Sequence, residues 1–346
     1  MEKLKTILLC LVLTGIAWNG GSAQLKMTGA GATFPYILYS KWFDVYHEKR
    51  GVEFNYQSIG SGGGIEQVIE GTVDFGASDV PMTDNQLKQV KDKQGIDILH
   101  IPTVMGAVVV TYNIQSVGTG LRLTPDALVG IFLGEITNWN DPKIVSSNQG
   151  KTLPDEAIIV AHRSDGSGTT NIFTDYLSKV STSWQQKVGK GPSVNWPIGL
   201  GGKGNEGVSG LVKQSEGSIG YVELAYAVKN NLAYAALQNK AGKFVDATFD
   251  AVSAAAARSV KTMPPDLRVS ITNADGDRSY PISGFTWLLT YHVMKDKNKE
   301  RAMVDFLKWA MADGQSFAKD LYYVPLPKEV ITLCEKKIEM INSGGN

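Results

Sequence analysis

A glycine-rich turn that also carries serine or threonine occurs three times in this chain, each time directly before a segment with helical periodicity. The turns are Gly29-Ala30-Gly31-Ala32-Thr33-Phe34-Pro35, Gly60-Ser61-Gly62-Gly63-Gly64 and Ser164-Asp165-Gly166-Ser167-Gly168-Thr169-Thr170. The first N–H groups of a helix lack partners within it and carry a partial positive charge. Glycine lets a ligand approach the backbone, and a hydroxyl adds a donor. Three such turns in one chain indicate a site built around a small oxyanion.

Strand-like and helix-like segments alternate through the first part of the chain. The predicted strands are 25–28, 52–56 and 73–77. Leu38 and Trp42 lie on one face of the helix predicted after the first turn. This βαβαβ order predicts a parallel sheet whose ligand site lies at the carboxyl ends of the strands. The first two turns and Asp79 fall at those ends.

A second domain is predicted in the central region. A continuous apolar stretch predicts a buried strand within 101–112, and a helical pattern follows at 125–132. A predicted strand at 158–161 runs into the third turn, and a helical stripe follows it. The strand–turn–helix arrangement of the first part therefore recurs here. Outside this region, near the end of the chain, a second buried strand is predicted at 285–291 and a helix at 301–311.

The N-terminus has the layout of a secretory signal peptide. Lys3 and Lys5 precede an apolar run, and small residues end at Ala23, where we expect cleavage. The run is too short to span a bilayer, and the alternative interpretations are an N-terminal membrane anchor and a buried helix. Cys10 follows two leucines rather than a small residue, so we do not expect a lipoprotein. Cys334 is then the one cysteine of the exported chain, and we expect it to pack on a C-terminal helix.

The overall charge of the chain gives no reason to expect a strongly charged partner. Lys and Arg number 34, Asp and Glu also number 34, and 43% of the residues are hydrophobic. This composition describes a globular chain long enough for two domains, and it does not favour nucleic acid or an acidic membrane surface. Recognition of an anion must therefore be local.

The sequence context does not support a metal site, a nucleotide-binding loop or a catalytic nucleophile. No metal-ligand spacing joins the histidines, which are His47, His100, His162 and His292. Segment 199–204 fits the spacing G-x-G-x-x-G, but Asn195-Trp196-Pro197 before it is a poor strand, so we expect a flexible loop near the cleft. Ser167 lacks a nucleophile elbow and an assignable base. We therefore expect no cofactor, no metal and no catalytic residue.

Two polar features point to the ligand. Arg163 precedes the third turn, and a cation at a helix N-terminus opposes the helix dipole unless an anion lies between them. Asp79 is a carboxylate beside a predicted anion site, which is favourable if the ligand carries a proton that the carboxylate accepts. Phosphate keeps a proton near neutral pH and sulfate keeps none, so Asp79 would reject sulfate. The alternative is that Asp79 is a turn residue before Pro81.

Taken together, five segments resemble the exported phosphate-binding proteins of bacterial high-affinity phosphate ABC transporters. They are Thr28-Gly29-Ala30-Gly31-Ala32-Thr33-Phe34-Pro35, Val73-Asp74-Phe75-Gly76-Ala77-Ser78-Asp79, Arg163-Ser164-Asp165-Gly166-Ser167-Gly168-Thr169, Trp196-Pro197-Ile198-Gly199-Leu200-Gly201-Gly202-Lys203-Gly204-Asn205 and Gly220-Tyr221-Val222-Glu223. The resemblance covers essentially the whole chain after the predicted signal peptide.

This resemblance implies an α/β fold of the two-lobed periplasmic-binding-protein class (type II-like), with parallel and mixed sheets flanked by helices and a ligand cleft between the lobes. After a signal peptide at 1–23, it implies a discontinuous first lobe at 24–104 and 282–346 and a second lobe at 105–281. It also implies a periplasmic monomer that binds inorganic phosphate, delivers it to the permease subunits of an ABC transporter and performs no chemistry.

The resemblance further implies ten ligand-binding residues: Ala32, Thr33, Phe34, Ser61, Asp79, Arg163, Asp165, Ser167, Gly168 and Thr169. Thr33 and Phe34 would donate backbone N–H groups beside a turn lined by Ala32. Ser61 and Thr33 would add hydroxyls, and Asp79 would accept the proton of the ligand. In the second lobe, Arg163 would pair with phosphate while Asp165 holds it, and Ser167, Gly168 and Thr169 would close on the anion.

Two alternatives use the same scaffold. A secreted phosphatase would need a metal site or an activated nucleophile, and neither is found in the sequence. A binder of sulfate or another oxyanion would conflict with the role expected of Asp79.

Overall fold

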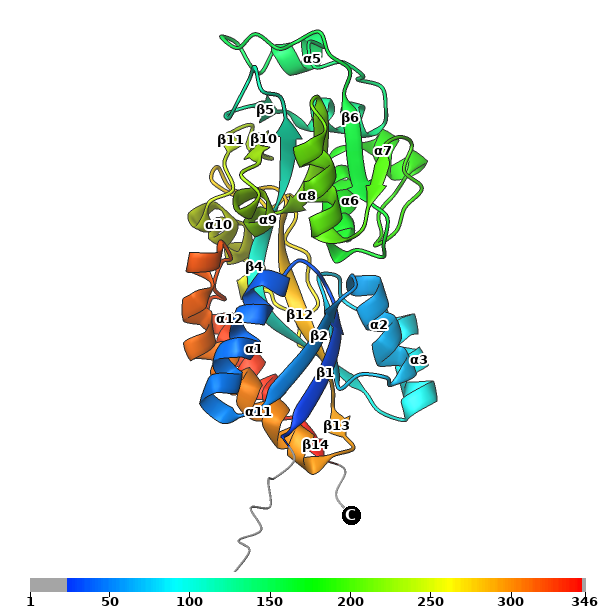
Figure 1. Ribbon diagram of the computed structural model, residues 1–346, viewed down its shortest axis with the longest axis vertical. Helices are drawn as coiled ribbons and strands as arrows, with labels where there is room; N and C mark the ends of the chain where they lie inside the picture. The colour runs from blue at the N-terminus through cyan, green and yellow to red at the C-terminus, as the bar shows by residue number, and fades with distance from the viewer. Residues whose placement is uncertain (1–23, 344–346) are drawn as a thin grey trace, which may run out of the picture.

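The computed structural model describes residues 24–343, and the chain forms two lobes, one above the other in Figure 1. The predicted signal peptide at 1–23 lies outside the described residues. Within residues 24–343, no helix combines the length and the apolar character that a membrane span requires.

The first lobe, at the bottom of Figure 1, begins with the predicted alternation of strands and helices. Its elements are β1 (Lys26–Gly31), α1 (Tyr36–Arg50), β2 (Glu53–Ser58), α2 (Ser61–Glu70), β3 (Phe75–Ser78) and α3 (Asp84–Gln94). β1 pairs in parallel with both β2 and β3, which confirms the predicted parallel arrangement. The carboxyl ends of these strands point toward the second lobe (Figure 1).

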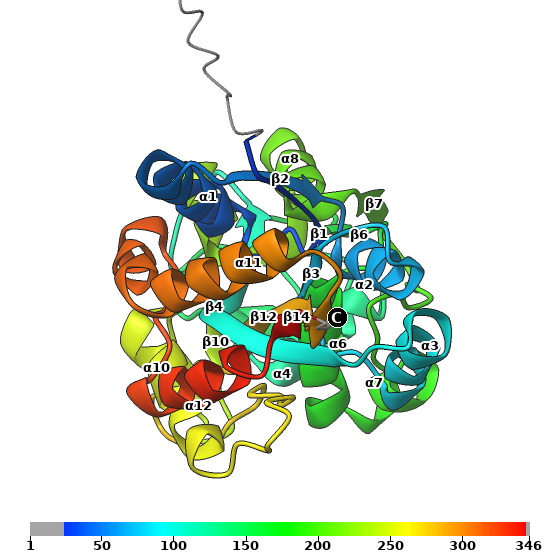
Figure 2. The same cartoon turned by 90° about the horizontal axis from the view of Figure 1, so that it is seen from below.

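Helices cover both faces of the first-lobe sheet. Figure 2 shows α1 and α11 (Lys297–Met311) on one side and α2 and α3 on the other. Aromatic rings fill the space between the sheet and the first pair of helices: Phe54 of β2 lies 4.7 Å from Phe43 and 4.6 Å from Phe306, measured between ring centroids. Such pairs contribute beyond the burial of their surface. The sheet edge that carries the site is thus held by a rigid core.

The strand β4 (Ile98–Asn113) belongs to both lobes. Residues 98–107 pair antiparallel with β12 (Ser283–Tyr291), and residues 108–113 pair antiparallel with β8 (Ser218–Glu223). β12 also pairs with β3, so the strand order is β2-β1-β3-β12-β4-β8-β6-β7. All of β12 and nearly all of β4 are buried, as the predicted apolar stretches require. One curled mixed sheet therefore runs through the whole molecule.

The second lobe surrounds the far half of this sheet. β6 (Ile159–Arg163) pairs in parallel with β7 (Leu200–Gly202) and with β8. The helices are α4 (Pro125–Phe132), α5 (Pro142–Val145), α6 (Gly168–Val180), α7 (Thr182–Lys187), α8 (Gly204–Gln214), α9 (Leu224–Lys229) and α10 (Phe249–Lys261). Short strands are β5 (Arg122–Leu123), β9 (Ala233–Tyr234), β10 (Ala236–Gln238) and β11 (Phe244–Val245).

The C-terminal part of the described chain returns to the first lobe. After α11 it contains two 3₁₀ turns, η1 (Asp313–Phe317) and η2 (Lys319–Leu321), and then α12 (Lys328–Ile338). β13 (Val293–Met294) and β14 (Asn342–Ser343) form a two-stranded sheet. Cys334 is buried on α12 with its Sγ 3.4 Å from the carbonyl of Pro102, which confirms its predicted packing role.

The segment 199–204 is not the flexible loop that the sequence predicted. It contains β7, followed at once by the first turn of α8, so the strand–turn–helix arrangement occurs a fourth time. The prediction was wrong because β7 has only three residues and begins shortly after Pro197, which leaves no alternating pattern to detect.

Candidate functional site

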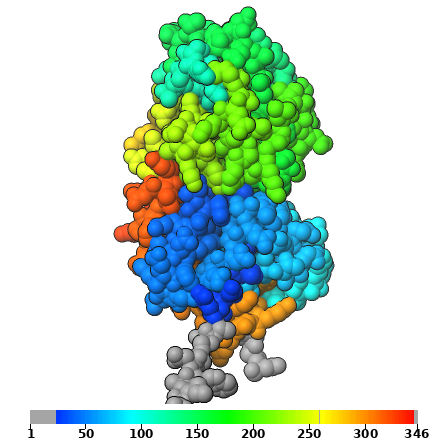
Figure 3. Space-filling view, viewed as in Figure 1, coloured from blue at the N-terminus to red at the C-terminus, as the bar shows by residue number. Residues whose placement is uncertain are grey.

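The carboxyl ends of β1, β3 and β6 meet where the two lobes touch. Thr33 lies in the turn after β1, Asp79 directly follows β3, and Arg163 ends β6. The close packing of β1 and β3 requires glycine at Gly31, because its φ is 144° and a Cβ there would lie 2.0 Å from the carbonyl oxygen of Ala77. In Figure 3 the second lobe rests directly on the first across this junction.

Asp79 is enclosed by hydrogen-bond donors. Thr286 Oγ1 in β12 donates to Oδ1 at 2.8 Å, and Ser61 Oγ at the start of α2 donates to Oδ2 at 3.4 Å. The Asp79 backbone N–H donates to the same Ser61 hydroxyl at 3.1 Å. The residue is 3% exposed. A buried carboxyl of this kind keeps a fixed position and direction.

Burial raises the pKa of Asp79 to about 7, because the charged form loses its hydration. Hydrogen bonds from Thr286 and Ser61 and the positive charge of Arg163 act in the opposite direction and do not outweigh burial. The carboxyl therefore changes protonation near neutral pH. A neighbouring group that brings its own proton can share that proton with Asp79.

Arg163 is held in place by Asp165 and Thr169. Its Nε donates to Asp165 Oδ1 at 2.7 Å and its Nη2 to Oδ2 at 2.5 Å, while Nη1 donates to Thr169 Oγ1 at 3.3 Å. A guanidinium has five N–H donors, so two remain for a ligand. Burial opposes the charged form of Asp165, but the hydrogen bonds and charge of Arg163 outweigh it and lower the pKa of Asp165. The Asp165 carboxylate therefore stays ionised and fixes the plane of the Arg163 guanidinium.

The N-terminus of α6 lies against the first lobe. Ser167 is its N-cap, accepting a hydrogen bond from the Thr170 N–H at 3.0 Å. A Cβ on Gly168 would lie 2.5 Å from Ser61 Oγ and 2.6 Å from Asp79 Oδ2. Because both distances are shorter than real Cβ contacts, a glycine is required there for the lobes to meet. The positive end of the helix dipole consequently faces Asp79 and Ser61.

Several backbone donors at this junction have no acceptor within residues 24–343. They are the N–H groups of Thr33, Phe34, Ser61, Gly168 and Thr169. The Ala32 N–H differs, because it donates to the Ala77 carbonyl at 2.9 Å and only lines the turn. Unpaired N–H groups at two helix N-termini and one tight turn form an anion-binding arrangement.

Direct hydrogen bonds join the lobes around the site. Gly62 N–H of α2 donates to the Gly166 carbonyl at 2.8 Å. Asn205 Nδ2 donates to Thr33 Oγ1 at 2.7 Å, and Tyr226 Oη donates to the Thr33 carbonyl at 2.7 Å. The structure thus describes the lobes in a closed arrangement.

Three residues of this network were missed by sequence reasoning. Thr286 orients Asp79, Asn205 contacts Thr33, and the Gly204 N–H donates to Asp165 Oδ1 at 3.0 Å. A threonine within a buried apolar strand was the available signal for Thr286. Gly204 and Asn205 belong to the glycine-rich segment 196–205, within which 199–204 was interpreted as a flexible loop. The segment was therefore noticed, but no role in the site was inferred for either residue.

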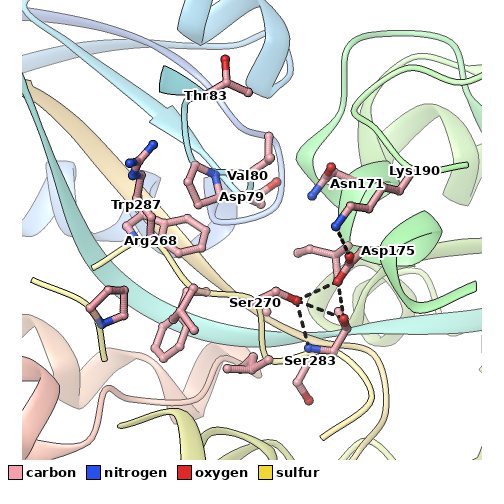
Figure 4. A pocket seen from close by; sticks show the side chains of 18 of the residues that line it. Asp79, Val80, Thr83, Asn171, Asp175, Lys190, Arg268, Ser270, Ser283 and Trp287 are labelled. Atoms are coloured by element: carbon pink, nitrogen blue, oxygen red, sulfur yellow. Dashed lines mark hydrogen bonds and ion pairs between the residues drawn. The ribbon is translucent and has the colours of Figure 1, made fainter. Parts of the chain in front are cut away.

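A groove of about 610 Å³ lies beside Asp79 between the lobes (Figure 4). Arg268 lines the groove where it meets the first lobe, and its Nη1 donates to the Met82 carbonyl at 2.8 Å. Ser270 Oγ donates to Asp175 in α6 at 2.7 Å, and Lys190 donates to the same carboxylate at 2.7 Å. Of the ten predicted ligand residues, only Asp79 lines this groove. The donors at the starts of α2 and α6 lie beside Asp79 but do not line this groove.

The donor set defines what can bind at the junction. Within the described part of the chain, no group of three or more His, Cys, Asp or Glu residues could hold a metal ion. Backbone N–H groups, hydroxyls and a fixed guanidinium favour a small anion rich in acceptor oxygens. The Asp165 carboxylate is occupied by Arg163, whereas the Asp79 carboxyl favours an anion that also carries a proton.

Comparisons with known proteins agree with this geometry. The family model described as PBP superfamily domain matches residues 17–313. A phosphate-binding protein PstS from Pasteurella multocida is 48% identical over 322 residues, covering 92% of each chain. Another, from Methanocaldococcus jannaschii, is 40% identical over 368 residues, covering 96% of this chain and 94% of the relative.

Solved structures show the same fold. A high affinity periplasmic phosphate-binding protein bound with phosphate matches with a TM-score of 0.72 and 23% identity, covering 89% of this chain and 92% of the other. A phosphate-binding protein from Stenotrophomonas maltophilia matches with a TM-score of 0.69 and 19% identity, covering 90% and 93%. The two-lobed α/β fold expected from the resemblance is thus confirmed, and the chain belongs to the PBP superfamily and, within it, to the family of PstS phosphate-binding proteins.

Proposed function

We propose that this protein binds inorganic phosphate between its two lobes in the periplasm and delivers it to an ABC-type membrane permease. The observation that carries the proposal is the position of the buried Asp79 carboxyl, which faces the N-termini of α2 and α6. At this position the Asp79 carboxyl can accept one proton, and the N–H groups around it can donate hydrogen bonds to oxygen atoms of a ligand. Phosphate meets both requirements, since it presents several acceptor oxygens and a proton.

Each predicted ligand residue has a role in this proposal. N–H groups of Thr33, Phe34, Ser61, Gly168 and Thr169 donate to phosphate oxygens, and Arg163 adds its two remaining N–H groups. Asp165 holds the guanidinium, Ser167 caps α6, and Ala32 shapes the turn. Asp79 accepts the proton of the ligand. The anion is thereby surrounded without a bulk positive charge on the protein.

We place the lobe boundaries at 104/105 and 281/282, so that residues 24–104 and 282–346 form the first lobe and 105–281 the second. The change of partner of β4, from β12 to β8 after Ala107, supports this division. Opening and closing about these crossings would admit and release the ligand. The protein would act as a monomer after removal of residues 1–23.

The proposal assigns no chemistry to the site, in agreement with the names of the relatives, which describe binding. The phosphatase alternative is tested by incubating the pure protein with a chromogenic phosphomonoester. We expect no turnover that scales with protein concentration, whereas proportional turnover would establish the enzyme instead.

Calorimetry of the mature chain with phosphate and with sulfate at pH 8 tests the binding proposal. We expect one phosphate per chain and a preference over sulfate of at least about 100-fold, because sulfate would leave Asp79 facing an acceptor without a proton. Sulfate binding as tight as phosphate binding would contradict the proposal.

A further inference from the structure

We propose that Asn205 is a positioning residue that fixes the hydroxyls of Thr33 and Thr169 as donors toward the bound anion. This inference rests on the proposed phosphate site and concerns how that site becomes selective. Asn205 lies in the first turn of α8 and is fully buried. It contacts both hydroxyls at once, with Thr33 in the first lobe and Thr169 in the second.

The orientation of the Asn205 amide is set by a backbone donor. The Glu223 N–H, at the end of β8, donates to Asn205 Oδ1 at 2.9 Å. Because a backbone N–H can only donate, the oxygen of the amide must face β8 and the NH₂ group must face the site. Asn205 therefore presents two protons to the two hydroxyls.

The Thr33 hydroxyl oxygen accepts two hydrogen bonds, both from Asn205. Asn205 Nδ2 donates to Thr33 Oγ1 at 2.7 Å and the Asn205 backbone N–H donates to it at 3.3 Å. A hydroxyl oxygen accepts at most two hydrogen bonds. Its own proton has no acceptor within the described residues and remains for a ligand.

The Thr169 hydroxyl oxygen also accepts two hydrogen bonds. It accepts from Arg163 Nη1 at 3.3 Å and from Asn205 Nδ2 at 3.3 Å. Neither threonine oxygen can then accept from a ligand, and both can only donate. A site whose hydroxyls are locked as donors favours an oxygen acceptor and disfavours a donor such as an ammonium or a second protonated oxygen.

The same contacts make the selectivity depend on closure. Thr33 reaches Asn205 only when the lobes are together, since the two residues belong to different lobes. In an open form the Thr33 hydroxyl would be free to turn and to bond with water. Asn205 thus completes the donor set in the closed arrangement.

Asn205→Asp replaces the NH₂ group, a donor to both hydroxyls, with a carboxylate oxygen, an acceptor, and leaves the shape of the side chain almost unchanged. The carboxylate accepts the protons of Thr33 and Thr169 and withdraws them from the anion. We expect phosphate affinity at pH 8 to fall by about 100-fold or more, and by about tenfold in Asn205→Ala, which leaves the hydroxyls free to turn. The ratio of variant to wild-type affinity should recover as the pH falls to 5, because a protonated aspartate can donate again.

Asn148→Asp is the matched control. Asn148 is also buried in the second lobe, its Oδ1 also accepts a backbone N–H, from Arg122 at 2.8 Å, and it lies beside α5, away from the junction. Its phosphate affinity should equal that of the wild type at both pH values. A loss in Asn205→Asp below threefold at pH 8, or one that is the same at pH 5 and pH 8, would overturn the inference.

A second measurement applies if Asn205→Asp fails to fold. The losses of affinity in Asn205→Ala and Thr33→Val should be less than multiplicative in the double variant, because both act through the Thr33 hydroxyl. Independent, multiplicative losses would refute the inference. Absence of phosphate binding by the wild-type chain would instead refute the proposed function, so the two failures are distinguishable.

Discussion

At the scale of single residues, the site depends on a carboxyl that titrates near neutral pH. Asp79 is buried among Ser61, Thr286 and the approaching Arg163, and its pKa is raised to about 7. The ionised carboxylate repels an anion that has no proton and accepts a hydrogen bond from one that has a proton, whereas the protonated carboxyl can donate to either. Because it can take either form near neutral pH, Asp79 can share a proton with the ligand, and the protonation of both groups decides which anions fit.

We predict that Asp79→Asn lowers phosphate affinity by about 10- to 100-fold and raises sulfate affinity by a similar factor. The amide loses the charge-assisted hydrogen bond to the phosphate proton and gains an N–H that sulfate can accept. Calorimetry with both anions at pH 8 measures the two changes. Asp74→Asn is the control, since Asp74 bonds Thr28 and Lys299 outside the site. An unchanged preference in Asp79→Asn would disprove the role of Asp79.

The pKa of Asp79 also predicts a pH dependence for sulfate. Below about pH 7 the carboxyl is protonated and can donate to sulfate, and above it the charge repels sulfate. The affinity for sulfate should therefore be nearly constant at acid pH and fall about tenfold per pH unit above 7. Competition titrations from pH 5 to pH 9 measure this slope, which should be absent in Asp79→Asn. A flat profile in the wild type would contradict it.

At the scale of elements, the site is formed by helix N-termini that two lobes bring together. In residues 24–343, the N–H group of Ser61 at the start of α2 and those of Gly168 and Thr169 at the start of α6 have no acceptor, and each helix follows a parallel strand. The glycines at these starts permit the approach, as the close contacts at Gly168 show. Each strand, the turn after it and the helix that follows together position the N–H donors at the start of the helix.

We predict that Gly168→Ala lowers phosphate affinity by about 10- to 100-fold, because its Cβ would overlap Ser61 and Asp79 and hold the lobes apart. Calorimetry measures the loss. Gly210→Ala on α8 is the matched control, since a Cβ there meets nothing within 4 Å. That variant should bind normally and be more stable by about 0.5–1 kcal/mol. Normal binding by Gly168→Ala would show that the lobes need not meet there.

The sequence predicted elements of very different lengths. The apolar strands β4 and β12 were predicted because burial on all sides leaves a continuous signal, and the short strands β1, β3 and β6 because each ends at a polar or glycine-rich turn. The ligand residues predicted in β1–α1, β3 and β6–α6 stay a prediction, which rests on segments where glycine, hydroxyl and charge occur together. β7 was missed because three residues carry no period, and with it Asn205 was missed. The antiparallel place of β12 between β3 and β4 depends on contacts far apart in the chain, which local patterns do not encode.

At the scale of the whole molecule, one sheet continues through both lobes. β4 pairs with β12 in its first part and with β8 in its last, so the two lobes share this strand. Polar contacts across the junction, such as Gly62 to Gly166 and Asn205 to Thr33, form only when the lobes meet. These contacts favour the closed arrangement, and a ligand that bonds to both lobes would favour it further.

We predict that phosphate makes the protein more compact in solution. Small-angle X-ray scattering should give a smaller radius of gyration with phosphate than after its complete removal, and sulfate at the same concentration should leave the radius unchanged at pH 8. Gly168→Ala should stay in the larger form even with phosphate. Equal radii of the wild type with and without phosphate would mean that closure does not depend on the ligand.

A crystal structure of the mature chain grown with phosphate tests the central claim most directly. The account predicts one tetrahedral anion between the lobes, within about 3 Å of the Asp79 carboxyl, of the Arg163 guanidinium and of N–H groups at the starts of α2 and α6. An anion contacted by one lobe alone, or bound with the Asp79 carboxyl beyond hydrogen-bond distance, would contradict it.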